Sequence, residues 1–311
     1  MTTAGAGEQK IGLILSGGGA RGFAHIGVLH AMERVGLHAD VVAGTSIGAI
    51  LGALYCAGHS AADIDRLAGE TSWRDVFDLS LQTGLIKGDK LHGFLAELLP
   101  ERFEDLDKPL AVATTDMESG EQLFIVSGDL IRAVRASSCF PGAFEPITLA
   151  GRTLADGGIV NNLPVNAVAF LDATFTIASD ATAPRRAVMT GDEQRGNWWE
   201  RMVATVRLER RNPMAQMVLR SVDIMQSMLT DIQYNLHPAD VKIRHDMPHI
   251  RVESFREFEA IIALGEATAE RTFREAGSLA APRAAEVEPA PRRSTAETPD
   301  QPEPKPPGVG H

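Results

Sequence analysis

Ser46 lies in residues 44–48, GTSIG, which match the pattern G-x-S-x-G. An apolar run at 41–43 precedes this stretch, and a run compatible with a helix follows it. A serine between a strand and a helix in this pattern lies on a sharp turn with its hydroxyl exposed, where it can attack a carbonyl carbon. The pattern predicts Ser46 as a nucleophile. The alternative is a tight strand-to-helix turn in which Ser46 only caps the helix.

A glycine loop, SGGGARG at residues 16–22, lies between another predicted strand and helix. Gly17, Gly18 and Gly19 have no side chains to block their N–H groups, and the helix that follows adds the positive end of its dipole. This predicts an anion site suited to a tetrahedral oxyanion. The spacing also matches a dinucleotide fingerprint, but the acidic residue that fingerprint needs is missing from the end of the next strand, since Asp40 lies at its start.

The serine needs a group that accepts its proton. His237, His245 and His249 follow Ser46 late enough for a Ser-Asp-His order, but none lies in a glycine-rich turn, and His245 and His249 flank what looks like a surface connection. Asp156 is the other candidate, because two glycines follow it and would let its carboxylate enter a crowded cleft. In isolation an Asp-Gly-Gly stretch also fits an Asx turn or a helix cap.

The segments that must position these residues alternate between strands and helices. Short apolar runs predict strands at 11–16, 39–44, 109–116, 121–128 and 173–180. Helical spacing predicts helices at 22–36, at 47–58 and from Ser254 to about Ala276. This order predicts an α/β fold with a mostly parallel sheet between helices, and a hairpin between the 109–116 and 121–128 strands makes the sheet mixed.

Composition limits the class of protein. The 311 residues are 44% hydrophobic and carry a net charge of -11, which supports a full core and argues against general nucleic-acid binding. Cys56 and Cys139 are the only cysteines and are expected to be core thiols in a reducing compartment. We expect a catalytic domain over 1–278 and a disordered, Pro-rich tail over 279–311.

Membrane crossing is not expected from this sequence. No apolar run reaches the roughly 20 residues that a membrane-spanning helix needs. The polar N-terminus lacks the basic start and apolar stretch of a signal peptide. We therefore expect a cytoplasmic protein that at most visits the inner surface of a membrane.

Four stretches in order resemble the sequence blocks of patatin-like phospholipases, and the bacterial proteins related to neuropathy target esterase resemble the chain most. The resemblance covers roughly residues 10 to 275, through GLILSGGGARGFAHIGVL, AGTSIGAI, ASSCFPGAFEPI and ADGGIVNNLP. It implies a three-layer α/β/α fold and a Ser–Asp dyad without a catalytic histidine. It also implies an acyl hydrolase for phospholipids or lysophospholipids that needs no metal or cofactor.

Carried over by position, the resemblance assigns Ser46 as the nucleophile and Asp156 as its partner. Gly17, Gly18 and Gly19 would line the oxyanion hole, mainly through the amides of Gly18 and Gly19. Three residues would contact substrate: Arg21, Ile47 and Pro141. Arg21 could equally form a structural ion pair. Ser137 and Ser138 would shape the cleft, and Asn162 and Pro164 would support the aspartate loop.

Residues 181–230 match the family least. Apolar residues recur there at helical spacing, among them Met217, Ile224, Met225 and Met228, and six arginines against two glutamates lie between 195 and 220. Such a stripe is typical of a core or oligomer contact, and its functional alternative is an acyl-chain groove or an interfacial lid. For the whole chain, a Ser-His-Asp esterase and a non-catalytic lipid or nucleotide-binding module remain as alternatives.

Overall fold

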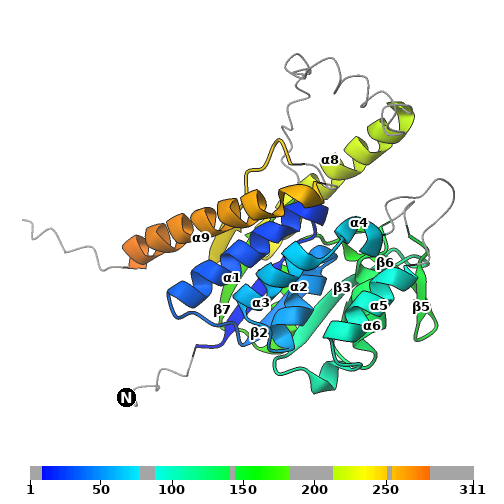
Figure 1. Ribbon diagram of the computed structural model, residues 1–311, viewed down its shortest axis with the longest axis horizontal. Helices are drawn as coiled ribbons and strands as arrows, with labels where there is room; N and C mark the ends of the chain where they lie inside the picture. The colour runs from blue at the N-terminus through cyan, green and yellow to red at the C-terminus, as the bar shows by residue number, and fades with distance from the viewer. Residues whose placement is uncertain (1–8, 78–87, 141–143, 183–212, 251–253, 281–311) are drawn as a thin grey trace, which may run out of the picture.

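A computed structural model describes residues 9–77, 88–140, 144–182, 213–250 and 254–280 of the chain. Its centre is an eight-stranded sheet with the order β5-β6-β3-β2-β1-β7-β8, and β4 pairs with β3 beside this path (Figure 1). The strands are β1 Ile11–Leu15, β2 Val41–Thr45, β3 Leu110–Asp116, β4 Gln122–Ile125, β5 Ile147–Leu149, β6 Arg152–Asp156, β7 Phe175–Asp180 and β8 Val241–Arg244.

Five neighbouring strands, from β3 through β2, β1 and β7 to β8, run parallel. The β3–β4, β3–β6 and β5–β6 pairs are antiparallel, so the sheet is mixed and mostly parallel, and the predicted hairpin is confirmed. The inner strands are buried along their whole length because helices cover the sheet. The carboxyl ends of the parallel strands therefore meet at one edge.

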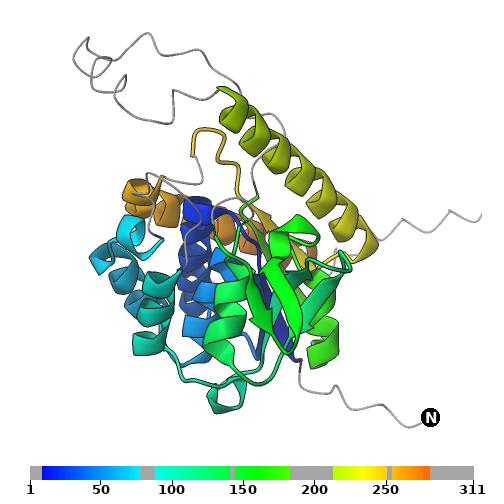
Figure 2. The same cartoon turned by 90° about the vertical axis from the view of Figure 1, so that its right-hand side faces the viewer.

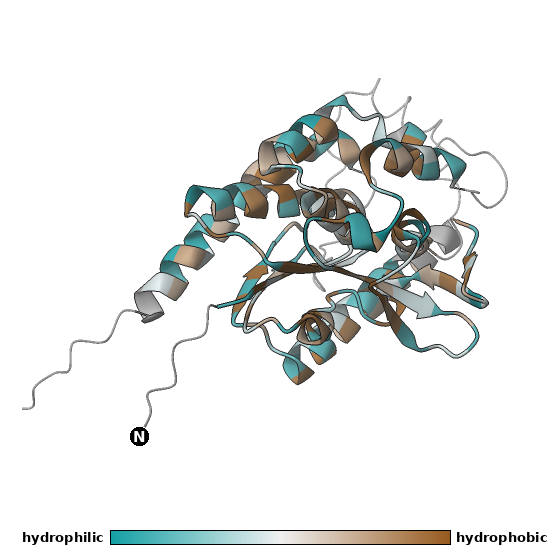
Figure 3. Cartoon of the chain, turned by 90° about the horizontal axis from the view of Figure 1, so that it is seen from below, coloured by the Kyte–Doolittle hydropathy of each residue, from teal (hydrophilic) through white to brown (hydrophobic). Residues whose placement is uncertain are grey.

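Most helices cover one face of the sheet (Figures 1 and 3). Their apolar sides form the larger core with that face, around Phe23, Ile26, Ile50 and Leu54. Cys56 and Cys139 are both buried and free, as predicted. The helices are α1 Ala24–Arg34, α2 Ile47–Cys56, α3 Ala61–Glu70, α4 Trp73–Val76, α5 Asp89–Leu98, α6 Leu130–Ser137 and α9 Phe258–Ala280.

The opposite face has a thinner cover. The 3-10 helix η4, Val165–Leu171, packs there in a second, smaller core. The helix α8, Pro213–Leu236, lies on the side of the molecule away from α3 and α5 (Figure 2). Its Tyr234 packs against this smaller core. The structure thus confirms the predicted α/β fold with helices on both faces of a mostly parallel sheet. The expected tail lies almost wholly outside the described residues, so its boundary stays a prediction.

β8 and the chain after it differ from expectation. Val241 and Ile243 are buried and alternate with Lys242 and Arg244, which makes a short edge strand. Four alternating residues are too few to stand out in a sequence. His245 continues from this strand and is 1% exposed, so the expectation that it lies in a surface connection is wrong.

α1 and α9 cross at very short range because each has a glycine at the contact. A Cβ at Gly265 would collide with the carbonyl oxygen of Ala24, and a Cβ at Gly27 would collide with that of Ile262. Both neighbours are helix backbone, which cannot move aside cheaply. This contact fixes α1, the helix that leads out of the glycine loop.

Gly265→Ala should therefore destabilise the fold by about 1–3 kcal/mol, since its methyl group meets backbone. Gly277→Ala, in the same helix, is the matched control because nothing lies within 4 Å of its added Cβ. It should be neutral or stabilise by up to about 1 kcal/mol through helix propensity. Urea unfolding followed by circular dichroism measures both, and equal effects would contradict the close contact.

Candidate active site

Ser46 lies on a strained turn between β2 and α2. Its φ of 54° and ψ of -124° are unusual for a residue with a side chain. The flanking glycines make the turn possible: a Cβ at Gly44 would lie 2.5 Å from the carbonyl oxygen of Gly48, and a Cβ at Gly48 would lie 2.6 Å from that of Ser16. Both glycines of the G-x-S-x-G pattern are thus required by close packing against backbone.

Ser137, at the end of α6, holds this turn in place. The backbone N–H of Ser46 donates to the Ser137 hydroxyl at 2.8 Å, and that hydroxyl donates to the Ala113 carbonyl at 2.6 Å. A buried hydroxyl thus connects the turn to β3. Ser137 was expected to shape the cleft, and in the structure it contacts the backbone of the proposed nucleophile.

Asp156 ends β6 and is buried, with 4% of its surface exposed. Its carboxylate accepts a hydrogen bond from the Gly158 N–H at 2.7 Å and another from the Ser46 hydroxyl. Burial raises the pKa of Asp156 to about 6, and the two hydrogen bonds oppose that rise. The structure therefore brings together the two residues that the sequence proposed as a dyad, and the carboxylate is a stronger base than an ordinary aspartate.

The glycine loop lies beside this pair. The Gly17 N–H donates to the Asn162 carbonyl at 3.1 Å, and the Asn162 amide donates to the Gly17 carbonyl at 3.3 Å. The N–H groups of Gly18 and Gly19 have no hydrogen-bond partner among the described residues. A Cβ on Gly17 would lie 3.4 Å from the Ser46 Cβ, so the loop and the serine are neighbours. Within the described residues, the loop next to Ser46 therefore has two N–H groups without a partner, and the role of the three glycines as an oxyanion hole stays a prediction.

The three residues expected to bind substrate are in different situations: two are buried in the structure, and one lies outside its described residues. Arg21 is buried, lies 3.6 Å from the Asp223 carboxylate and donates to the Ile250 carbonyl, so it connects the glycine loop to α8. Ile47 is 2% exposed and packs directly on Gly22. Pro141 lies outside the described residues. Substrate contacts of these three remain predictions.

None of the three late histidines is placed as a base for Ser46. His237 and His249 are exposed at the surface. His245 shares the Ser179 hydroxyl with His25, at 2.9 and 2.7 Å, and His25 also contacts the Ser16 carbonyl at 2.9 Å. Burial lowers the pKa of His25 to about 4 and that of His245 to about 3, so both are neutral. This row of hydrogen bonds ends at Ser16, the first residue of the glycine loop.

α8 contributes polar groups that sequence reasoning did not assign to the site. The Gln226 side-chain nitrogen lies 2.8 Å from the position of a Cβ on Gly158, next to the Asp156 loop. Further along the helix, Asp231 accepts from Arg244 at 3.1 Å. These contacts join residues far apart in the chain, and no local pattern marks them.

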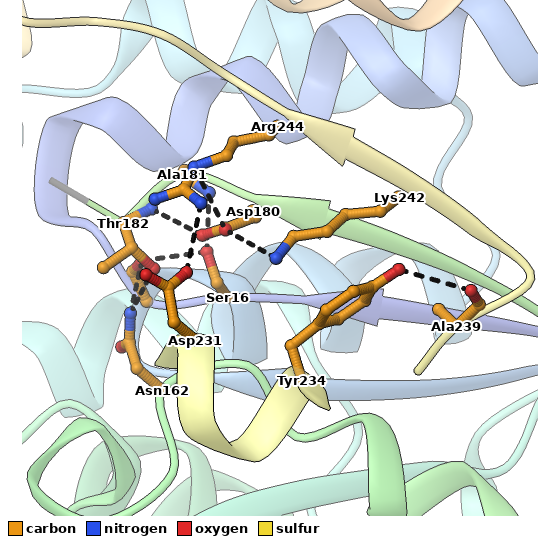
Figure 4. A network of polar contacts seen from close by, with 11 residues as sticks. Ser16, Asn162, Asp180, Ala181, Thr182, Asp231, Tyr234, Ala239, Lys242 and Arg244 are labelled. Carbon is orange, nitrogen blue, oxygen red and sulfur yellow. Dashed lines mark hydrogen bonds and ion pairs between the residues drawn. The ribbon is translucent and has the colours of Figure 1, made fainter. Parts of the chain in front are cut away.

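Figure 4 shows how the C-terminal part of α8, with Asp231 and Tyr234, is joined to the carboxyl ends of β7 and β8. Asp180 lies between Lys242, at 3.6 Å, and Arg244, at 3.9 Å. The Lys242 ammonium also lies 3.7 Å from the centre of the Tyr234 ring. The Ala181 N–H, next to Asp180, donates to the Ser16 hydroxyl at 2.8 Å, so the network reaches the start of the glycine loop.

The fold and the site together have the arrangement that serine hydrolases use, with a strained serine, a carboxylate partner and a glycine loop in which two N–H groups lack a partner in the part of the chain that the structure describes. The family model described as patatin-like phospholipase matches residues 13–169. The chain belongs to this family.

Relatives support the same assignment. Neuropathy target esterase sws of Drosophila melanogaster is 36% identical over 203 residues, which are 61% of this chain and 14% of that protein. An NTE family protein of Mycobacterium tuberculosis is 34% identical over 179 residues, or 56% of this chain and 49% of that one. Lysophospholipase NTE1 of Scheffersomyces stipitis is 34% identical over 201 residues, which are 61% of this chain and 13% of that protein. The chain thus matches half or less of the length of each.

The raised pKa of Asp156 has a consequence for stability. Above a pH of about 6 the folded protein contains a buried carboxylate, which is less favourable than in the unfolded chain, where the pKa is near 3.8. Asp156→Asn should therefore stabilise the fold by about 1–3 kcal/mol near neutral pH, and the gain should vanish below a pH of about 4, where the wild-type group is protonated in both states.

Urea unfolding across this pH range measures the effect. Asp116→Asn is the control of opposite sign, because the Glu118 N–H and Arg152 lower the pKa of Asp116. That change should destabilise the protein at neutral pH. A stabilisation by Asp156→Asn that does not depend on pH would contradict the raised pKa.

Proposed function

We propose that this chain is a serine acyl hydrolase that cleaves acyl esters of phospholipids or lysophospholipids through a Ser46–Asp156 dyad. One observation carries the proposal: the Ser46 hydroxyl donates to the buried Asp156 carboxylate, and the glycine loop next to Ser46 has two N–H groups, of Gly18 and Gly19, without a hydrogen-bond partner in the described parts of the chain. A nucleophile, a base and an anion site then lie at one edge of the sheet.

The reaction follows from this geometry. Asp156 accepts the proton of Ser46 as the oxygen attacks the acyl carbonyl carbon, and the N–H groups of Gly18 and Gly19 donate to the oxyanion that forms. Such donors contribute on the order of 3 kcal/mol each to the transition state. The tetrahedral intermediate then expels the alcohol, which takes the proton from Asp156. Water attacks the acyl-enzyme in the same way and releases the fatty acid.

The substrate class rests on the family. The matched family is described as phospholipases, and the fungal relative is named a lysophospholipase. Since the chain matches only part of those relatives, lipid hydrolysis by this chain is part of the proposal. No helix in the described parts of the chain is long and apolar enough to cross a bilayer. Contact with lipid would then occur at the surface of a membrane or micelle.

Product analysis tests the proposal. Lysophospholipids, phospholipids and short-chain p-nitrophenyl esters are incubated with the protein, and released fatty acid or nitrophenol is measured. The wild type should hydrolyse at least one lipid ester, and Ser46→Ala and Asp156→Asn should each lower kcat by about a thousandfold or more, because each removes one half of the dyad.

Three histidine variants serve as matched controls for the base. His237→Gln, His245→Gln and His249→Gln should each keep the rate within about tenfold of the wild type, whereas loss of a general base costs about a hundredfold or more. Loss of turnover in any one of them, with the fold intact by circular dichroism, would favour a Ser-His-Asp esterase. A folded wild type without any ester hydrolysis would favour a binding module.

A further inference from the structure

α8 has its polar and apolar faces the opposite way round from an ordinary surface helix. Several of its polar side chains point toward the protein: Ser227 and Thr230 are each 1% exposed, and Asp223 and Asp231 form ion pairs with the body. Apolar side chains between 39% and 72% exposed form a stripe on the outside, made of Met217, Ile224, Met225, Met228, Ile232 and Leu236. Four residues of the stripe expected as core or oligomer contact therefore lie at the surface.

This outer stripe is fixed to the candidate active site through the inner face of the helix. Asp223 contacts Arg21 of the glycine loop, and Gln226 lies next to Gly158 of the aspartate loop. Closer to the C-terminal end of α8, Asp231 accepts a hydrogen bond from Arg244 (Figure 4). Anything that binds the stripe is thereby held beside Ser46 and Asp156.

The size and charge of the stripe restrict its partner. Nineteen helical steps separate Met217 from Leu236, so the stripe is about 28 Å long, which exceeds the scattered apolar contacts normal for a protein surface. Asp223 and Asp231 are the only acidic residues of α8, and both are turned inward. Although the whole chain carries a net charge of -11, the stripe itself therefore presents no carboxylate.

We propose that the α8 stripe is the surface by which this protein binds the lipid aggregate that contains its substrate. A long apolar stripe without acidic groups can lie in the headgroup region, with its side chains between the acyl chains. Its three methionines are unbranched and flexible, which suits a fluid partner better than a fixed one. The helix lies on the lipid surface and brings the site to it. The inference rests on the proposed function for the identity of the partner.

Vesicle flotation tests the inference independently of hydrolysis. The full chain carrying Ser46→Ala is mixed with phosphatidylcholine vesicles, with and without phosphatidylglycerol, and the protein that floats with the vesicles is measured. The Ser46→Ala protein should bind. Adding Met225→Gln, Met228→Gln and Ile232→Gln should lower the partition coefficient by roughly tenfold or more, because three side chains no longer enter the apolar layer.

The matched control carries Val35→Gln and Phe170→Gln in the same Ser46→Ala chain. These residues are also exposed, at 55% and 73%, but they lie outside α8, and their replacement should leave flotation unchanged. Circular dichroism and the urea midpoint establish that each variant is folded. Because every arm carries Ser46→Ala, a failure of the proposed hydrolysis does not affect the result.

Two outcomes would overturn the inference. In the first, the Ser46→Ala protein does not float with either vesicle, or the stripe variant floats as well as its parent. In the second, sedimentation shows a dimer that the stripe variant dissociates, without vesicle binding by the parent. A second copy of the chain would then cover the stripe.

Discussion

The hydrogen bond between the Ser46 hydroxyl and the Asp156 carboxylate is the interaction on which the site depends. It forms in a buried place, where an ionised carboxylate is unfavourable and its pKa rises to about 6. The same burial that destabilises the charge makes the group a better base. Because the serine and the aspartate are 110 positions apart, only the order of the strands brings them together.

Several backbone contacts maintain this hydrogen bond. The turn at Ser46 requires Gly44 and Gly48, and Ser137 holds its N–H. Asn162 exchanges two hydrogen bonds with Gly17 and so fixes the glycine loop against the aspartate loop. Behind the loop, the neutral pair His25 and His245 meets at one serine hydroxyl. The polar interior at this edge thus serves to position backbone as well as to supply reacting groups.

The sequence was sufficient to predict the parts of the site that depend on local conformation. The glycine loop, the Ser46 turn and Asp156 each lie in a short stretch with a recognisable turn or strand end, and the main parallel strands are continuous apolar runs. Short edge strands such as β8 were missed because four alternating residues give little periodicity. The burial of His245 and the position of Gln226 next to Gly158 depend on contacts between segments far apart in the chain, which no local pattern reveals. For α8 the sequence left open whether the apolar stripe is core, an oligomer contact or a lipid surface, because periodicity shows that a helix has an apolar face but not which way that face points; the structure excludes only the core.

The pH dependence of covalent labelling of Ser46 by a fluorophosphonate tests the central claim most directly, because the reaction requires only the nucleophile, its base and the anion site. The account predicts a labelling rate that falls as the pH drops through about 6, the pKa of Asp156, with the same midpoint in His245→Gln. Asp156→Asn should label far more slowly at every pH. Labelling of Asp156→Asn at the wild-type rate, or a midpoint that moves when His245 is replaced, would contradict a base formed by Asp156 alone.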